Sequence, residues 1–160
     1  MIKAVSQKIL ILHDIRSSQN VGALFRTADA AGITKIYLSG YTPAPVDQFN
    51  RPNSQLIKAS LGAEKAIPWE KTGTIFPLLR KLDKEGVQTI AIEQSASSVD
   101  YKKIKVKESV AFILGNEVEG LPKKVLEKVT LVAEIPMRGE KESLNVSVAG
   151  GIALFRILNV

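Results

Sequence analysis

The sequence contains no cysteine and a single histidine, His13. Disulfide bonds and zinc sites made of cysteine and histidine are therefore excluded, and so is catalysis by a cysteine nucleophile. Composition alone does not exclude magnesium bound by carboxylates, but we expect no metal site. No segment approaches the ~20 consecutive apolar residues that a helix needs to cross a bilayer. We therefore expect a cytoplasmic protein that does not enter the membrane.

The 160 residues are 45% hydrophobic, which is enough to fill the core of one compact domain. Lysine and arginine outnumber acidic residues to give a formal net charge of +6. A positive charge favours an anionic partner such as RNA or DNA, although many basic proteins have no such partner. Charge alone is therefore a weak indication of function.

The N-terminal third alternates between strand and helix patterns. Residues 8–14 form a continuous apolar run, which is typical of a strand covered on both faces of a parallel sheet. A helical pattern follows and ends at Gly32, and residues 33–38 predict a second strand. The helical positions are Val21, Leu24, Phe25, Ala28 and Ala31.

The same alternation continues along the chain and predicts an α/β fold, a mostly parallel sheet flanked by helices. Residues 39–52 form a long proline-rich loop, and residues 95–109 form a polar connection containing four lysines, either a solvated edge or a phosphate-contacting surface. We predict helices at 53–61, 75–84 and 123–128, an extended segment at 65–69, and strands at 87–92, 110–114 and 131–135.

The segment 144–158 is apolar on both sides of a helix, so we expect protein to enclose it. Gly150 and Gly151 each cost ~1 kcal/mol of helix propensity relative to alanine, which close packing within or between subunits would offset. Ser143 and Asn145 stand at the start of this helix. Their simplest interpretation is that they cap its free N–H groups.

Polar residues follow strands in three segments, 20–26, 115–120 and 136–145. Open α/β sheets bind ligands at the carboxyl ends of their strands, so these segments are candidate sites. The glycine spacing in residues 115–120 matches neither the dinucleotide fingerprint nor the phosphate loop. A conventional NAD or ATP site is therefore unsupported.

With their flanking residues, these segments read NVGALFRTADAAG (20–32), FILGNEVEGLP (112–122) and IPMRGEKESLNVSVAGGIALF (135–155). Together they resemble the SpoU (TrmH-like) branch of the SPOUT methyltransferases. The resemblance implies a homodimer that transfers a methyl group from S-adenosylmethionine to a ribose 2′-hydroxyl of tRNA or rRNA. It also implies a C-terminal trefoil knot, which no periodicity predicts. We expect residues 1–160 to form a single methyltransferase domain without a separate RNA-binding domain.

The resemblance also assigns roles to individual residues. The catalytic positions that it implies are Asn20, Arg26, Glu117, Ser143 and Asn145. Cofactor contacts, largely through the backbone, would come from Leu114, Gly115, Asn116, Ile135, Met137 and Leu144. Arg16, Arg138 and Lys141 are candidates for RNA contact.

Methyl transfer from a sulfonium requires mainly that the ribose oxygen be aligned and lose a proton. An arginine fork suits the phosphate beside the target ribose, but a guanidinium with a pKa above ~12 is a poor base. We therefore interpret Arg26 as a phosphate-coupled activator and leave the proton acceptor open.

Each residue also has a simpler interpretation. Arg26 could form an ion pair with Asp29 on an exposed helix face. Glu117 could cap a turn, Arg138 and Lys141 could only keep their loop soluble, and His13 could be a hydrogen-bonded structural residue. For the whole chain, the alternatives are a SPOUT enzyme that methylates a base and a noncatalytic RNA-binding protein.

Overall fold

The computed structural model describes residues 5–160, which contain a seven-stranded sheet in the order β3-β2-β1-β6-β4-β7-β5. Every pair of neighbouring strands is parallel, as the alternation of strand and helix patterns predicted. The strands are β1 Lys8–His13, β2 Lys35–Ser39, β3 Trp69–Lys71, β4 Gln88–Ile92, β5 Val99–Asp100, β6 Val110–Leu114 and β7 Leu131–Glu134.

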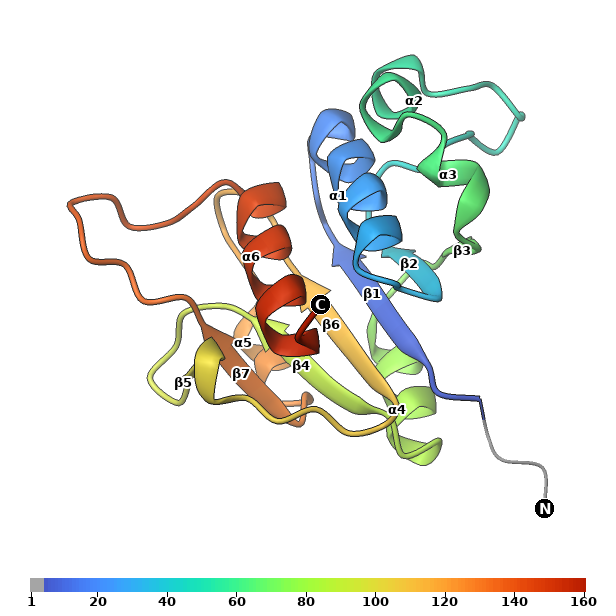
Figure 1. Cartoon of the computed structure of the whole chain (residues 1–160). Coiled ribbons are helices and arrows are strands. Elements are labelled where there is room, and N and C mark those ends of the chain that lie inside the picture. The colour runs from blue at the N-terminus through green and yellow to red at the C-terminus, as the bar shows by residue number, and fades with distance from the viewer. Residues whose placement is uncertain (1–4) are drawn as a thin grey trace.

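Helices cover both faces of the sheet. In Figure 1, α1, α2, α3 and α6 lie on one face, and α4 and α5 lie on the other. The fold is thus a three-layer α/β arrangement. The helices are α1 Ser18–Ala30, α2 Ser54–Ser60, α3 Ala63–Ala66, α4 Phe76–Lys84, α5 Lys123–Leu126 and α6 Val146–Leu158, with a 3-10 turn η1 at Tyr101–Lys103.

The apolar run in β1 is explained by its two covered faces. Leu10 and Leu12 belong to the core between the sheet and the layer of α1 and α6, while Ile9 and Ile11 belong to the core beneath α4 and α5. Because successive side chains of a strand point to opposite faces, a strand between two helical layers must be apolar throughout. β1 is therefore an interior strand of the sheet, between β2 and β6.

Helix α1 connects β1 to β2 and begins two residues earlier than its apolar pattern indicated. Ser17 caps it by accepting a 3.1 Å hydrogen bond from the N–H of Asn20. At the other end Gly32 adopts a φ of 74°, which a residue without Cβ tolerates. The cap places Asn20 in the first turn of the helix, at the edge of the sheet where β1 ends.

Two predictions for the middle of the chain were wrong. Residues 65 and 66, expected to begin the extended segment 65–69, belong instead to helix α3, because alanine, glutamate and lysine are good helix formers; Ser60 Oγ also donates a hydrogen bond to the buried Glu64. The connection 95–109 contains the short edge strand β5, which pairs with β7. A two-residue strand has too little periodicity to be recognised in a sequence.

Helix α6 is enclosed on one side only. Its buried residues include Gly150, where an added Cβ would lie 2.6 Å from Leu24 Cδ2 and 2.9 Å from Leu114 Cδ1. The close approach expected at Gly150 is thus an approach to α1 and β6 within the chain. On the other side Val148 is 49% exposed, and Ile152 and Phe155 are also exposed. The expectation that protein encloses the whole helix is not met within one chain.

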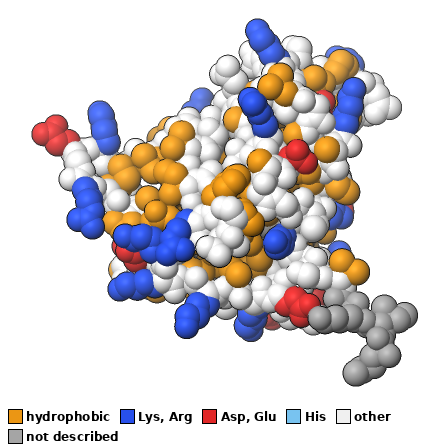
Figure 2. All heavy atoms as spheres, in the orientation of Figure 1, with side chains coloured by type: hydrophobic (Ala, Val, Ile, Leu, Met, Phe, Trp, Pro, Cys, Tyr) orange, Lys and Arg blue, Asp and Glu red, His pale blue; other side chains and the backbone are white. Residues whose placement is uncertain are grey.

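Figure 2 shows the face that α1 and α6 present to solvent. Hydrophobic side chains are exposed near the middle of this face, and lysine and arginine side chains are distributed around its margin. Among the described residues, no helix has the length and apolar character required to cross a membrane.

Candidate functional site

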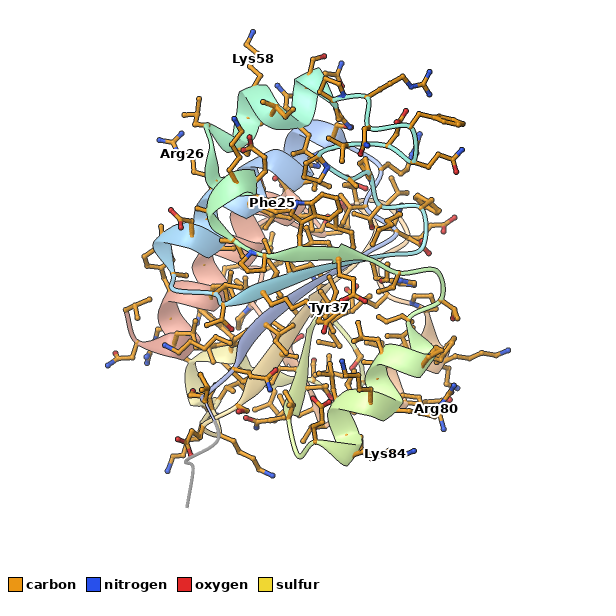
Figure 3. The ribbon with its side chains drawn as sticks, turned by 90° about the vertical axis from the view of Figure 1, so that its right-hand side faces the viewer. Phe25, Arg26, Tyr37, Lys58, Arg80 and Lys84 are labelled. Carbon is orange, nitrogen blue, oxygen red and sulfur yellow. The ribbon has the colours of Figure 1, made fainter. Side chains whose placement is uncertain are left out.

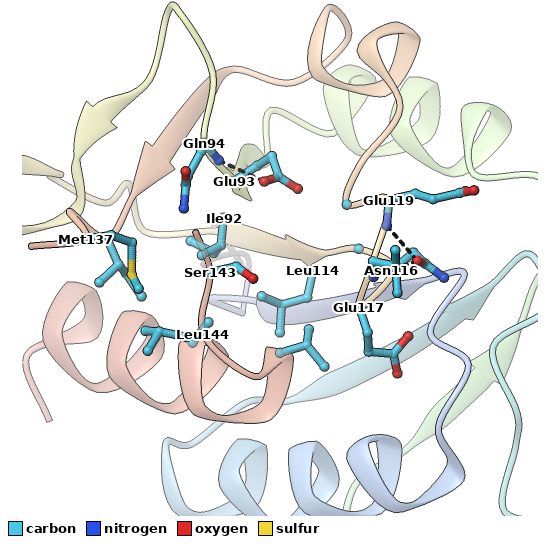
Figure 4. Close-up of a pocket in the computed structure, with 16 residues that line it drawn as sticks. Ile92, Glu93, Gln94, Leu114, Asn116, Glu117, Glu119, Met137, Ser143 and Leu144 are labelled. Carbon is cyan, nitrogen blue, oxygen red and sulfur yellow. Dashed lines mark hydrogen bonds between the residues drawn. The ribbon is translucent and has the colours of Figure 1, made fainter. Parts of the chain in front are cut away.

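One pocket opens where β4, β6 and β7 end. Because the strands are parallel, their carboxyl ends lie at the same edge of the sheet, and the segments that follow them form the pocket walls (Figure 4). All six residues that the resemblance assigned to the cofactor line this pocket. The lining includes Leu114, Gly115, Asn116, Ile135, Met137 and Leu144, together with Glu117 and Ser143.

The carboxylate of Glu117 connects this pocket to the start of α1. Its two oxygens accept hydrogen bonds from the N–H of Arg16 at 2.9 Å and the N–H of Ser17 at 3.0 Å. The side-chain amide of Asn20 donates a third hydrogen bond of 3.1 Å. Burial alone would raise the pKa of Glu117, but these donors outweigh it and lower the pKa. Glu117 is therefore ionised at neutral pH.

Asn145 joins the third polar segment to the same cluster. Its amide nitrogen donates a 3.2 Å hydrogen bond to Oδ1 of Asn20. Its Oδ1 also accepts from the N–H groups of Ser147 at 2.9 Å and Val148 at 3.3 Å, so Asn145 is the N-cap of α6. The capping interpretation of Asn145 is confirmed, and the side chain at the same time reaches Asn20.

The turn after β6 keeps its shape through Asn116 and Gly120. Oδ1 of Asn116 accepts from the N–H groups of Val118 at 2.9 Å and Glu119 at 2.8 Å. Gly120 has a φ of 67°, and a Cβ there would lie 2.3 Å from a carboxylate oxygen of Glu93. A side chain at Gly120 is therefore disfavoured by the backbone conformation, and it would also displace the carboxylate of Glu93.

The pocket has the surfaces that S-adenosylmethionine requires. Ile92, Leu114 and Met137 supply apolar side chains against which an adenine ring can pack. Within residues 5–160, the main-chain N–H groups of Met137 and Leu144 make no hydrogen bond to another residue. Unpaired donors beside apolar walls suit the edge of a purine, so these residues fit the cofactor that the resemblance implies.

Arg26 lies outside this pocket. It is six residues beyond Asn20 on α1, a rise of about 9 Å, and it lines a separate groove between α1 and α6 with Thr27, Gly151 and Phe155. In Figure 3 its side chain points away from the body of the molecule. No ion pair joins Arg26 to Asp29 in the described part of the chain. The structure thus brings together Asn20, Glu117 and Asn145 but leaves Arg26 apart within one chain.

The candidate RNA-binding residues and His13 are not among the residues that line this pocket. Arg16, Arg138 and Lys141 are exposed, and the backbone of Arg16 is held by Glu117. His13 is buried at the end of β1, and its Nδ1 lies 2.9 Å from Oγ of Ser39. Burial lowers the pKa of His13, and nearby Asp14 opposes this effect. His13 is thus a hydrogen-bonded core residue.

Three further side chains at the site were not identified from the sequence. Glu93 accepts a 2.9 Å hydrogen bond from the N–H of Leu121, and Gln94 donates one of 2.7 Å to the carbonyl of Glu142. Both residues follow β4, which lies between β6 and β7 in the sheet. The hydroxyl of Tyr41 lies 2.8 Å from the amide nitrogen of Asn116. Knowing that β4 lies between β6 and β7 would have identified Glu93 and Gln94 as site residues. No local sequence pattern gives that order of strands.

Comparisons with known proteins agree with this architecture. The model of the SpoU rRNA Methylase family matches residues 7–155. A 23S rRNA (guanosine-2′-O-)-methyltransferase, RlmB, from Xylella fastidiosa is 35% identical over 147 residues, which are 92% of this chain and 56% of that protein. The RlmB of Neisseria meningitidis is 33% identical over 146 residues, 91% of this chain and 56% of that protein. The chain thus spans a little over half the length of these curated relatives.

Solved structures share the fold. An AdoMet-bound rRNA methyltransferase from Sinorhizobium meliloti superposes with a TM-score of 0.87 at 32% identity, covering 99% of this chain and 58% of that one. The TrmH/SpoU tRNA modifying enzyme of A. aeolicus superposes with a TM-score of 0.83 at 26% identity, covering 96% of this chain and 75% of that one. The sheet and its helical layers are therefore those of SpoU methyltransferase structures.

Proposed function

Because the chain belongs to the SpoU rRNA methylase family, we propose that it transfers a methyl group from S-adenosylmethionine to a ribose 2′-hydroxyl of RNA. One observation carries the proposal: Asn20, Glu117 and Asn145, from three distant segments, form one hydrogen-bonded cluster beside a pocket at the strand ends. The pocket suits a nucleoside-bearing cofactor, and the cluster supplies polar groups beside it.

The pocket residues would hold the methyl donor. Leu114, Ile135 and Met137 would pack against its apolar parts, and the main-chain N–H groups of Met137 and Leu144 would bind its polar edge. When bound, the cofactor supplies a methyl group that is already electrophilic because it is attached to a sulfonium. The protein has mainly to exclude water and to align the accepting hydroxyl.

The polar cluster aligns that hydroxyl. Glu117 is ionised and fixed by three donors, so it orients the amide of Asn20, which in turn orients Asn145. Ser143 lies in the same wall of the pocket. A preorganised cluster of this kind positions a ribose without rearranging during the reaction.

Arg26 joins the reaction from a second copy of the chain. It lies in the groove between α1 and α6 with Phe155, and Val148 and Ile152 of the same helix are also exposed apolar side chains. A two-fold dimer through this face would bury those side chains and complete the enclosure of α6. Arg26 would then bind a phosphate next to the target ribose in the site of the other copy.

The dimer has a direct test. Light scattering of the purified protein should give the mass of two chains, and Phe155→Lys should reduce it to one. The matched control is Phe49→Lys, since Phe49 is also an exposed phenylalanine, 68% exposed, but lines a different hollow. A monomeric wild type would contradict the dimer.

RNA is the proposed substrate, with a net charge of +6 in support. The exposed cations of Arg16, Arg138 and Lys141 are the proposed phosphate contacts; Arg16 is bonded through its N–H to Glu117, and Arg138 and Lys141 belong to the loop that follows β7. Three predictions from the resemblance are not tested by the structure. They are a tRNA or rRNA substrate, a C-terminal trefoil knot, and a methyltransferase domain without a separate RNA-binding domain.

The function is tested in two steps. Calorimetric titration with S-adenosylmethionine should show one site per chain, and lack of binding would favour the noncatalytic RNA-binding protein. Incubation with total RNA and methyl-labelled cofactor, followed by digestion to nucleosides, should then recover the label on ribose. Label recovered on a base would favour the base methyltransferase instead.

A further inference from the structure

The loop between β2 and α2 holds an aromatic ring in solvent. Phe49 is 68% exposed, near the tip of residues 47–51. The carboxylate of Asp47 accepts hydrogen bonds from the N–H groups of Phe49 at 2.8 Å and Arg51 at 3.0 Å, and Asn50 adopts a φ of 59°. An exposed ring contributes little to folding, and ordering the turn that carries it costs conformational entropy. The fold itself gives no reason for a phenylalanine here.

The guanidinium of Arg51 lies over one face of this ring. The guanidinium carbon lies 5.1 Å from the centre of the Phe49 ring, and Nε donates a 2.6 Å hydrogen bond to Asp47. One face of the ring is thus covered by a cation that is itself held in place. Because the ring is largely exposed, its second face is open to solvent. An open aromatic face beside an arginine is the arrangement on which unpaired nucleobases stack.

Both ends of this loop are attached to the candidate active site. Near the first end, the hydroxyl of Tyr41 lies 2.8 Å from the amide nitrogen of Asn116, which precedes Glu117. At the second end, the amide of Asn53 donates a 2.9 Å hydrogen bond to Oγ of Ser18 at the start of α1. A shallow hollow between them is lined by Tyr41, Phe49 and Lys71 among others. The ring therefore stands on a surface continuous with the catalytic cluster.

We propose that residues 47–51 are a base-stacking element, in which Phe49 binds an unpaired base of the RNA next to the nucleotide in the active site. This inference rests on the proposed function and identifies the feature of the substrate that the chain recognises: single-stranded RNA on one side of the target. Around the ring the turn itself presents the polar and charged side chains of Gln48, Asn50 and Arg51, which suit contact with a nucleotide. The positive net charge of the chain complements the RNA backbone.

The test distinguishes binding to the bases of RNA from binding to its sugar-phosphate backbone. The probes are a fluorescein-labelled oligoadenylate of about twelve nucleotides and the same sugar-phosphate chain without bases, measured by fluorescence anisotropy. The wild type should bind the oligoadenylate about tenfold more tightly than the baseless chain. Phe49→Ala should remove this preference and leave binding of the baseless chain unchanged, whereas Phe49→Trp should restore it.

Leu61→Ala is the matched control, because it also removes an exposed apolar side chain but lies at the far end of α2. Its preference for bases should equal that of the wild type. The proposal is overturned if the wild type does not prefer the oligoadenylate, or if Phe49→Ala binds as the wild type does. Failure of methyl transfer to total RNA by the wild type would instead contradict the proposed function, so the two results are distinguishable.

Discussion

The side chains of Asn20 and Asn145 are 125 residues apart in the sequence and meet in a 3.2 Å hydrogen bond. Asn20 belongs to the first turn of α1, and Asn145 caps α6. The two helices pack side by side on one face of the sheet, so their N-termini lie beside the pocket (Figure 1). This contact links the chemistry of the site to the packing of the fold.

Asn145→Ser should separate the two roles of this residue. Serine is about as good an N-cap as asparagine, so the free energy of unfolding should change by less than ~0.5 kcal/mol. The shorter side chain does not reach Asn20, so methyl transfer should fall at least tenfold. Asn145→Ala should lose transfer and also ~1 kcal/mol of stability. Urea unfolding and transfer assays measure the two effects, and full activity of the serine variant would assign Asn145 to capping alone.

Glu117→Ala should weaken both the site and the fold. The substitution removes the acceptor of three hydrogen bonds, from Arg16, Ser17 and Asn20. Since hydrogen bonds to a charged group are stronger than neutral ones, we expect a loss of about 2 kcal/mol in the free energy of unfolding. Glu119→Ala is the control, because Glu119 is exposed in the same turn. Equal unfolding midpoints for the two variants would contradict this role of Glu117.

Gly22→Ala should separate α1 from α2. A Cβ at Gly22 would lie 2.3 Å from the carbonyl oxygen of Leu56, and the backbone of α2 cannot move away cheaply. We expect a loss of about 1 to 3 kcal/mol in the free energy of unfolding, the range of overpacked cores. Gly73→Ala serves as the control, since nothing lies within 4 Å of an added Cβ there. Thermal unfolding should show a lower midpoint for Gly22→Ala only; equal midpoints would mean that the helices adjust.

His13 should make stability depend on pH. Burial lowers its pKa in the folded state below the ordinary value of 6.5. The unfolded chain therefore binds the proton first, so the stability contributed by neutral His13 is present above about pH 6.5 and is lost as the pH falls through the lower folded pKa. In His13→Asn the decline in stability below about pH 6.5 should be shallower. Parallel curves for the two proteins would exclude His13 as the cause.

Much of the fold was predictable because its strands and longer helices have clear patterns. The apolar run of β1 and the helical spacing from Val21 to Ala31 indicated a buried parallel sheet with helices, and the solved relatives confirm this architecture. The shortest elements were missed: β5 has two residues and α3 has four, which is too few for periodicity to appear. β5 is stabilised by pairing with β7, and α3 by contacts with α1 and α2. Neither kind of long-range contact can be recognised in the local sequence.

The site was predictable only in part. Motif resemblance identified the pocket residues, whereas strand order, which no local pattern gives, brought Glu93 and Gln94 into the same wall. The position of Arg26 could not be predicted either. Helical spacing places Arg26 on the face opposite to the buried Leu24 and Phe25, but it does not tell whether solvent or a second copy covers that face.

The central claim is that Arg26 and the Glu117 cluster serve one reaction from two copies of the chain. Arg26→Ala and Glu117→Ala should each be nearly inactive alone while still folding. Co-expressed with different tags and purified through both tags, they form mixed dimers in which one of the two sites is intact, and this preparation should recover about half of the wild-type rate. A mixed dimer no more active than either variant alone would contradict the account.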